Sequence, residues 1–337
     1  MLKHTQRLLF LLVTVMSISL GVRAQDAHFS QFYANPLYLN PAFAGAKVCP
    51  RVVTNYRNQW PSVPGSYVTY NASFDMHFDA LAGGLGVMVT SDRSGQGVLT
   101  EQTASLIYAV RIRLSREWFM KAGIQASFFQ KTLDFDKLTF GDQIDPKWGF
   151  SNITLEKRPA NGGVYNIMDV DFSSGILVYN KRFFGGVAVH HLVPVNVALI
   201  EDGESYLPMK ITGHLGYMIP LNGGRRLRPG DPTISPNFVY MNQGPFHQYN
   251  WGAYFKKAPM IFGLWYRHFV ANDGWASDAI ILQAGFEYDK FKFGYSYDIT
   301  ISELASPSGG AHEFSFALDF NCPVKRRRMH EINCPSF

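Results

Sequence analysis

Between Ser66 and Asp79 the chain alternates between apolar and polar residues almost without interruption, in the sequence SYVTYNASFDMHFD. Successive side chains of an extended strand point to opposite faces, so one face of this stretch would be apolar and the other polar. The apolar face would carry Val68, Tyr70, Ala72, Phe74, Met76 and Phe78. Such a strand exceeds the ~5–6 residues usual in soluble proteins and fits the ~9–11 tilted residues that cross a membrane.

The same alternation recurs along the chain. It is clearest in LIYAVRIRL (106–114), WFMKAGIQASF (118–128), FKFGYSYDITIS (291–302) and EFSFALDF (313–320). Aromatic residues gather toward strand ends, as in the interfacial girdles of membrane barrels. These residues are Trp60, Tyr67, Trp118, Phe291 and Phe320. We expect about fourteen strands, near 51–60, 66–79, 82–91, 100–114, 117–130, 169–180, 182–193, 208–221, 233–242, 247–256, 259–270, 279–288, 291–301 and 312–320.

The connections between these segments also follow a pattern. Backbone groups in hydrocarbon must be hydrogen-bonded, so strands span a membrane only as a closed barrel. Short links follow most even-numbered strands, whereas about forty residues follow Phe129 and about fifteen follow Leu192. Outer-membrane barrels likewise have short periplasmic turns and longer outer loops; NQGP (242–245) and NGGRRLRPGDP (222–232) are exceptions. We therefore predict an all-β, transmembrane antiparallel β-barrel. The alternative is a soluble β-sandwich or a secreted lectin-like barrel.

The first 24 residues are typical of a signal peptide. A basic start, MLKHTQR, precedes an apolar stretch too short to span a membrane, and small residues precede Gln25. Its removal takes away three basic residues and no acidic ones, which lowers the net charge from +5 to 5 − 3 = +2. So weak a charge argues against nucleic acid as a partner. We expect export to the outer membrane and four parts: signal peptide 1–24, N-terminal brace or plug 25–50, barrel in outer-membrane lipid 51–320, and basic periplasmic tail 321–337.

Several stretches are more specific than alternation alone. They are HFSQFYANPLYLNPAFAG (28–45), NYRNQW (55–60), GGLGVMV (83–89), LDFDKLTFGDQIDPKWGF (133–150), VHHL (189–192), GYMIPL (216–221), ISPNFVY (234–240), QGPF (243–246) and GAHEFSF (310–316). In this order they cover essentially the whole chain after the signal. They resemble the PorP/SprF family of outer-membrane proteins attached to type IX secretion.

The resemblance implies a non-enzymatic barrel without a cofactor. Relatives either support the secretion machine or help a large secreted adhesin with a C-terminal sorting domain to reach and stay on the surface, a role tied to gliding motility. Some are linked to a periplasmic OmpA-like peptidoglycan-binding protein and to the ring lipoprotein of the machine. Because the tail resembles that of the adhesin-partner subgroup, we expect cargo binding. The alternatives are a machine component and a diffusion channel.

The N-terminal stretch 28–45 is rich in Asn-Pro steps, which favour turns over helix or strand. It either tucks into the lumen and organises a periplasmic contact, or braces the barrel by filling space. On the first strand, Arg57 faces the lumen if the aromatic residues beside it face lipid. Because an unpaired buried charge is costly, we expect Arg57 to pair with Asp75 or Asp79 of the neighbouring strand.

The loop after the fifth strand is the longest and is the first candidate for contact with an external protein. Its four carboxylates are ligands that Ca²⁺ accepts, but their spacing does not match a calcium-loop signature. The alternative is a loop that packs on its own aromatic residues. The candidate partner-binding residues are Asp134, Asp136, Phe140, Asp142, Asp145, Trp148 and Phe150.

No set of residues predicts catalysis or a bound metal. Asp75, His77 and Asp79 share one strand face but have no evident nucleophile beside them. Adjacent His190 and His191 should point to opposite faces of a strand, so they cannot chelate one ion together.

Three cysteines in an exported chain imply one disulfide and one remaining thiol. Cys49 precedes the first strand and Cys322 follows the last, so a bond between them would staple the barrel seam. A bond between Cys322 and Cys334 would instead close a loop in the tail, and both pairings stay open. A basic run in the tail either docks an acidic partner or anionic headgroups, or stays solvated. Its residues are Lys325, Arg326, Arg327 and Arg328.

Overall fold

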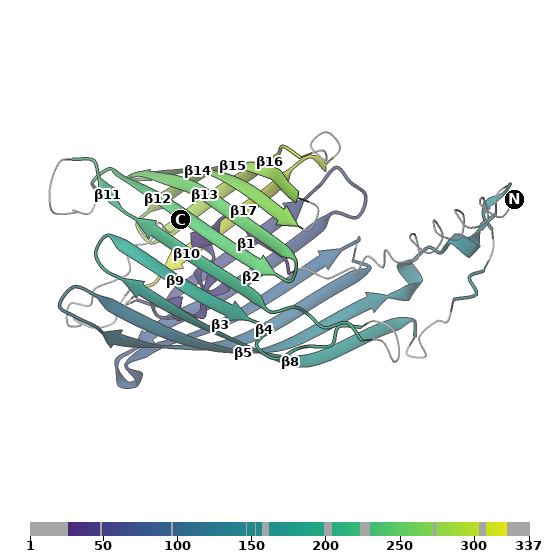
Figure 1. Cartoon of the computed structure of the whole chain (residues 1–337), viewed down its shortest axis with the longest axis horizontal. Helices are drawn as coiled ribbons and strands as arrows, with labels where there is room; N and C mark the ends of the chain where they lie inside the picture. The colour runs from purple at the N-terminus through teal and green to yellow at the C-terminus, as the bar shows by residue number, and fades with distance from the viewer. Residues whose placement is uncertain are drawn as a thin grey trace, which may run out of the picture.

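The computed structural model describes residues 26–321, apart from 48, 96, 146, 152, 157–161, 199–203, 223–229, 272–273 and 303–307. In this part of the chain, fourteen long strands form the wall of a barrel (Figure 1). The first seven are β1 (Arg51–Gln59), β2 (Tyr67–Phe78), β3 (Gly83–Ser94), β4 (Leu99–Arg113), β5 (Phe119–Asp134), β8 (Val164–Tyr179) and β9 (Phe183–His190). The other seven are β10 (Lys210–Tyr217), β12 (Thr233–Gln243), β13 (Phe246–Lys257), β14 (Met260–Ala271), β15 (Gly274–Tyr288), β16 (Phe291–Thr300) and β17 (Ala311–Asp319).

The remaining elements are short. Three are strands of two residues: β6 (Ile144–Asp145), β7 (Gly149–Phe150) and β11 (Ile219–Pro220). Three helical turns lie in connections: η3 (Asp79–Leu81), η4 (Phe135–Lys137) and η5 (Gly141–Gln143).

Each long strand pairs antiparallel with its neighbours, and the sheet closes on itself. β1 pairs with β17 along its whole length, beginning with Arg51 opposite Asp319, and β10 pairs with β12. Closure pairs the backbone groups of the wall with one another, which hydrocarbon requires. The expected closed antiparallel barrel of about fourteen strands is confirmed.

Most strands match the expected segments and several run further at one end, whereas β9 and β10 are shorter than the expected 182–193 and 208–221. β3 continues to Ser94, β5 to Asp134, and β8 begins at Val164, where alternation predicts a start near 169. These extensions lie at the end that bears the long loops, and Figure 1 shows β5 and β8 reaching beyond the rim. The apolar–polar alternation marks only the part of a strand that faces lipid. The hydrogen-bonded pairing between neighbouring strands continues beyond that part. We call the loop-bearing end the outer end and the opposite one the inner end, because long loops lie outside in such barrels.

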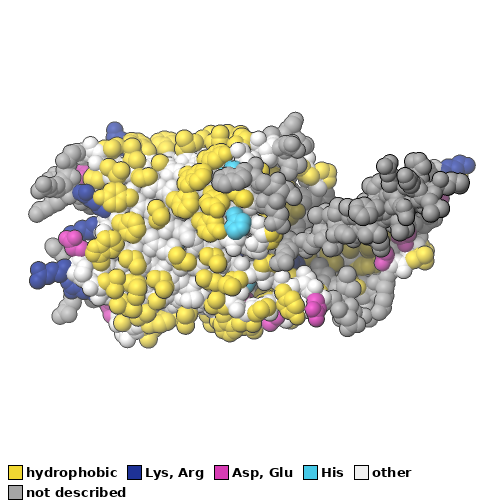
Figure 2. Space-filling view, viewed as in Figure 1, with side chains coloured by type: hydrophobic (Ala, Val, Ile, Leu, Met, Phe, Trp, Pro, Cys, Tyr) yellow, Lys and Arg dark blue, Asp and Glu magenta, His cyan; other side chains and the backbone are white. Residues whose placement is uncertain are grey.

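The outward face of the wall is apolar and the inward face is mostly polar or small. On β2, Phe74 is exposed outward, whereas Asn71, Ser73 and Asp75 are buried inside. Figure 2 shows hydrophobic side chains over the middle of one face, with charged side chains toward its two ends. Among the described residues, no helix has the length and apolar character needed to cross a membrane.

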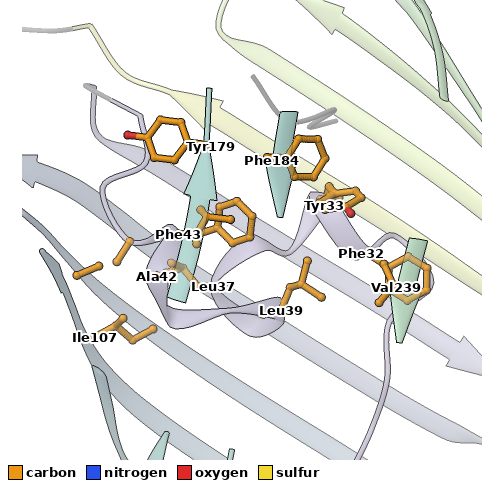
Figure 3. Packing of buried hydrophobic residues seen from close by; sticks show 14 of the residues in the cluster. Phe32, Tyr33, Leu37, Leu39, Ala42, Phe43, Ile107, Tyr179, Phe184 and Val239 are labelled. Atoms are coloured by element: carbon orange, nitrogen blue, oxygen red, sulfur yellow. The ribbon is translucent and has the colours of Figure 1, made fainter. Parts of the chain in front are cut away.

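The hydrophobic core lies inside the barrel, around the N-terminal segment 26–47. Every residue from Phe29 to Gly45 except Tyr38 is buried. The segment packs against inward side chains of the wall, including Tyr179 and Phe184 (Figure 3). Its own elements are three short helical turns: η1 (Phe32–Ala34), α2 (Pro36–Leu39) and η2 (Pro41–Phe43).

Candidate functional site

Asn-Pro steps shape the N-terminal segment. Pro36 and Pro41 each begin a helical turn, a position where the missing N–H of proline costs nothing. The Asn40 side chain accepts a hydrogen bond from the Ala42 N–H (2.9 Å) and donates one to the Ile176 carbonyl of β8 (3.2 Å). The same side chain therefore fixes the turn and attaches it to the wall.

Inward-facing glycines make room for this segment. A Cβ at Gly123 of β5 would lie 2.5 Å from the Ala42 nitrogen, and a Cβ at Gly84 of β3 would overlap the Ala44 carbonyl. Both neighbours are backbone atoms, which cannot rotate away as a flexible side chain can. The segment thus lies directly on the wall at positions that only glycine allows.

A luminal charge cluster ties the segment to the last strands. Arg57 lies 3.0 Å from Asp298 and 3.2 Å from Glu313, and all three side chains are at most 2% exposed. Ser30 donates from its N–H to Glu313 (2.7 Å) and from its hydroxyl to Asp298 (2.6 Å). Arg267 also lies 3.0 Å from Asp298. Two cations and two carboxylates are brought together, so each offsets the desolvation of another.

This cluster corrects the expected partner of Arg57. Arg57 does face the lumen, but Asp75 pairs with Arg51 (2.9 Å), and the Asp79 side chain is 61% exposed at the inner turn. The strand register is the physical reason. Across β1 and β2, Asp75 lies opposite Arg51, while Arg57 lies opposite Thr69.

Asp26 anchors the start of the segment near the outer end. Its carboxylate lies 2.9 Å from His191 Nε2 and 3.3 Å from Lys210 Nζ, and it accepts a hydrogen bond from Gln243 Nε2 (2.9 Å). Burial raises the pKa of Asp26, but the charges of His191 and Lys210 outweigh it and hold that pKa well below its usual value. Burial lowers the pKa of His191, whereas Asp26 and Asp171 raise it to about 10. Both partners are therefore charged at neutral pH. We call Asp26, His191, Lys210 and Gln243 the outer clasp.

The expectation that His190 and His191 point to opposite faces is wrong. β9 ends at His190, and His191 has a φ of 57°, a left-handed conformation that ends strand alternation. Both side chains border the same cavity inside the barrel. A turn at the end of the strand brings the second histidine back to the lumen.

The carboxylates of the outer loop 135–163 and of the preceding Asp134 organise local turns. Asp142 accepts a hydrogen bond from the Leu155 N–H (2.6 Å), and Asp145 accepts one from the Trp148 N–H (2.9 Å). Asp134 likewise accepts from the N–H of Asp136 (3.2 Å). Within the described residues, no three His, Cys, Asp or Glu side chains lie close enough together to hold a metal ion.

The outer loop also exposes an apolar surface. Phe135 and Phe140 pack together, with ring centroids 4.9 Å apart, but the other expected packing residues of the loop, Trp148 and Phe150, point outward. We call the exposed set the outer-loop patch; its side chains are between 51% and 93% exposed. It consists of Ile144, Trp148, Phe150, Ile153 and Leu155. Apolar groups this exposed, and outside the lipid-facing wall, are typical of protein contact sites.

A second outer loop folds over the lumen. Val195, Val197 and Leu207 form a buried cluster with Phe129 of β5. Hydrogen bonds from the Val197 N–H to the Ser205 carbonyl (2.7 Å) and from the Leu207 N–H to the Val195 carbonyl (2.9 Å) join the two arms of the loop. We call Val195, Val197 and Leu207 the lumen cap, because they pack on Phe129, an inward-facing residue toward the outer end of β5.

Two groups of expected sites remain: the pair at the inner turn, and the cysteines with the basic tail. His77 and Asp79 lie 3.3 Å apart at the inner turn. Cys49 lies just before β1, whereas Cys322, Cys334 and the basic run of the tail are outside the described residues.

Sequence reasoning missed most of the residues that hold the N-terminal segment. Ser30, Arg267, Asp298 and Glu313 come from distant parts of the chain. The available signal was a charged residue on the inward face of an apolar strand, as Asp298 is between Tyr297 and Ile299. That signal marks a luminal charge but does not identify its partner.

Comparisons with known proteins agree with this geometry. A family model described as "Type IX secretion system membrane protein PorP/SprF" matches residues 22–318. The chain is similar to the CymD monoaromatic hydrocarbon channel, with 11% identity and a TM-score of 0.51 over 88% of this chain and 95% of that one. It is also similar to the Ralstonia pickettii toluene transporter TbuX, with 8% identity and a TM-score of 0.49 over 86% and 94%. At such identities the likeness concerns the fold alone. No curated protein matches the chain in sequence.

Proposed function

Because the chain belongs to the PorP/SprF family of type IX secretion system membrane proteins, we propose that it binds a secreted cargo protein and retains it at the outer surface. The family match confirms the resemblance seen in the sequence. Family and fold indicate a structural or transport role in the outer membrane rather than catalysis. The proposal goes further in naming the cargo: an adhesin with a C-terminal sorting domain.

The observation that carries this proposal is the outer-loop patch. Its five apolar side chains lie on a loop that Asp142 and Asp145 hold in a defined shape. Burying one large apolar side chain stabilises a complex by roughly 1.5–3 kcal/mol, so a few of them suffice for specific binding. Trp148 and Phe150 are the central candidates, because aromatic residues dominate the energetics of many interfaces.

The filled lumen makes a diffusion channel the weaker alternative. A channel needs a continuous polar path, whereas the N-terminal segment runs through the lumen from Asp26 at the outer clasp to Gly45 beside Gly84 of β3. The lumen cap packs on Phe129 of β5. A role as a machine component would instead use the inner end, through the OmpA-like protein and the ring lipoprotein.

The test is mass spectrometry of proteins that co-purify with the tagged chain from native membranes in mild detergent. We expect a secreted protein with a C-terminal sorting domain at near-equal abundance. The double variant Trp148→Ala/Phe150→Ala should reduce its recovery at least tenfold. Tyr206→Ala is the matched control, because Tyr206 is an exposed aromatic residue on the other long outer loop.

Two outcomes would count against the proposal. Equal recovery of cargo with the double variant and the control would exclude the outer-loop patch as the binding surface. Recovery of the periplasmic partners without cargo would identify the chain as a component of the machine.

A further inference from the structure

The outer half of β8 has a free edge. β8 pairs with β5 along its whole length, but it pairs with β9 only from Ser174 to Tyr179. Just beyond this point the Leu192 N–H donates to the Phe172 carbonyl (2.9 Å). Further out, no strand of the described chain pairs with this side of residues 164–171, which span about 26 Å at about 3.3 Å per residue. We call residues 164–171 the β8 edge; Figure 1 shows it beyond the ends of β9 and β10.

The orientation of the backbone groups on the β8 edge follows from this contact. The Phe172 carbonyl points away from β5. Because the backbone direction alternates along a strand, the N–H groups of Asn166, Met168 and Val170 also point away from β5. The Val170 N–H donates to the Asp169 carboxylate (2.7 Å). Within the described residues the N–H groups of Asn166 and Met168 have no acceptor, so these donors and the carbonyls beside them are available to another strand.

The β8 edge lies at and above the outer boundary of the lipid-facing surface. Val170 lies opposite Phe128 of β5, and both are exposed apolar side chains on the outward face. Further out, the Asn166 side chain accepts a hydrogen bond from Gln130 Nε2 (3.1 Å), a polar pair suited to water. Unpaired backbone groups are costly in hydrocarbon. In water they are hydrated, and they can exchange that water for a partner strand.

The β8 edge lacks the features that usually prevent a strand edge from pairing. Proteins block exposed edges with lysine, proline or a β-bulge. The β8 edge contains neither lysine nor proline, and its pairing with β5 continues without a shift in register. Val164, Ile167 and Val170 are β-branched residues, which favour extended backbone. An open edge of this kind is a template for one more strand.

The side chains around the β8 edge define the strand that would fit it. On the outward face, Met168 and Val170 are 56% and 48% exposed, which favours apolar side chains beside them. On the opposite face the side chain of Asp169 is exposed. The flanking outer segments 134–170 and 192–209 contain four basic and nine acidic residues, a formal net charge of 4 − 9 = −5. A strand that alternates apolar with basic residues complements both faces.

We infer that the β8 edge binds an extended segment of the secreted cargo as an additional antiparallel strand, in which apolar residues alternate with lysine or arginine. In naming the cargo as the source of this strand, the inference rests on the proposed function. The outer loop connects β5 to β8, so a cargo bound to the outer-loop patch is held near the β8 edge. A second copy in the same membrane fits less well, because its β8 runs in the same direction and cannot pair antiparallel.

The first arm of the test adds a synthetic peptide to the full mature chain in detergent. The peptide has eight residues, alternates valine with lysine and has blocked ends. Residue-resolved hydrogen exchange should slow at least tenfold at Asn166 and Met168, and should not change at Tyr165 and Ile167, whose N–H groups face β5. Unchanged exchange, or exchange already slow without peptide because the chain itself covers the edge, would overturn the inference. A valine–glutamate peptide is the matched control; equal protection by both peptides would overturn the assignment of a basic strand.

The second arm compares recovery of the cargo with two variants at one position. Met168→Pro removes an N–H donor of the β8 edge, and proline is tolerated on an edge strand where its nitrogen faces solvent. Met168→Ala is the matched control, because it shortens the side chain but keeps the donor. We expect Met168→Pro to lower recovery at least tenfold relative to Met168→Ala, with the gel mobility of a folded barrel.

The outcomes of the second arm separate the two proposals. Equal recovery with Met168→Pro and Met168→Ala, while Trp148→Ala/Phe150→Ala loses the cargo, would refute strand addition and leave the proposed function intact. Absence of cargo from the wild type would refute the proposed function, and with it the cargo as the source of the strand. In that case, or if Met168→Pro does not fold, the first arm decides on the edge, because it uses the wild-type chain alone.

Discussion

At the scale of single residues, the lumen is organised by charges that are paired across long stretches of sequence. Ser30 contacts Asp298 and Glu313, and Asp26 contacts His191 and Lys210. Each group satisfies buried charges that would be costly alone. Replacing one charged residue of such a group should therefore lower the free energy of unfolding by more than the loss of its own hydrogen bonds, because an opposite charge is left buried without its partner.

Arg57→Ala tests the luminal charge cluster. It leaves Glu313 without its cation, and Asp298 with Arg267 alone. Breaking a buried ion pair from one side costs about 3–5 kcal/mol, and we expect about 3 kcal/mol, measured by denaturant unfolding in lipid or detergent. Arg113→Ala is the control, because Arg113 is exposed and bonds the Ser115 carbonyl (3.0 Å). Equal effects of the two substitutions would show that the cluster adds nothing to stability.

The outer clasp should make the free energy of unfolding depend on pH in the neutral to alkaline range. Burial lowers the pKa of His191, but Asp26 and Asp171 raise it to about 10, above the unfolded value of about 6.5. The contribution of His191 is thus complete below pH 6.5, declines as pH rises, and is lost above about 10. One linked proton gives a slope of about 1.4 kcal/mol per pH unit in this range.

His191→Gln should remove this slope when the free energy of unfolding is measured between pH 6.5 and 10. His312→Gln, a histidine bonded to the Tyr295 hydroxyl, should leave it unchanged. A wild-type slope in the His191 variant would contradict the assignment.

At the scale of elements, the strands were predictable and their partners were not. The apolar–polar alternation is a local property, because the type of each residue in β2 indicates which face of the strand it occupies. The approximate bounds of a strand can therefore be predicted from a short stretch of sequence. The register that places Asp75 opposite Arg51 depends on two strands and the turn between them. The outward extension of β5 and β8 is also hidden, because residues 131–134 and 164–168 do not continue a regular apolar–polar alternation.

Gly123→Val tests how the N-terminal segment sits on the wall. A Cβ there would lie 2.5 Å from the Ala42 nitrogen, so the segment must move. Overpacking of this kind costs roughly 1–3 kcal/mol. We expect new protease cleavage within residues 26–47 while the barrel keeps its folded gel mobility. Gly213→Val is the matched control, since Gly213 also lies on a strand but has open space around it. Protection of the segment in both variants would show that the close approach is not required.

The seam between β1 and β17 predicts which cysteines bond. The Phe320 N–H donates to the Pro50 carbonyl (2.9 Å), one step beyond the pair Arg51 and Asp319. Continuing this register would place position 49 opposite position 321, one residue before Cys322 in the sequence. Because Cys49 is thus close to Cys322 along the seam, we predict a Cys49–Cys322 bond, typically worth 2–4 kcal/mol. Peptide mapping without reductant should find this bond in Cys334→Ser and lose it in Cys322→Ser. A Cys322–Cys334 peptide in the wild type would overturn the prediction.

At the scale of the whole molecule, the N-terminal segment packs inside the barrel, so that the lumen is filled rather than open. The sequence left open whether the N-terminal stretch tucks into the lumen and organises a periplasmic contact, or braces the barrel by filling space. The structure places it in the lumen, where glycines at 84 and 123 accept its backbone. Sequence alone could not show this. In the sequence these two glycines look like ordinary strand residues, and the reason for their small size appears only when the segment that packs on them is known.

We expect the purified protein to be electrically silent in planar bilayers. Deleting residues 26–44 removes the segment that runs through the lumen and should produce ion conductance, provided that gel mobility shows a folded barrel. A double variant of the lumen cap, Val197→Ser/Leu207→Ser, should stay silent alone and increase the conductance of the deletion variant. Conductance in the wild type would revive the diffusion-channel alternative.

The contacts between Ser30 and the last strands also impose an order on biogenesis. Residues near the start of the mature chain are held by Asp298 and Glu313, which are synthesised almost at the end. The interior therefore cannot be completed until the final hairpin exists. A chain truncated before that hairpin would leave Ser30 and Arg57 without these two carboxylates, which gives the cell a physical difference between finished and unfinished copies.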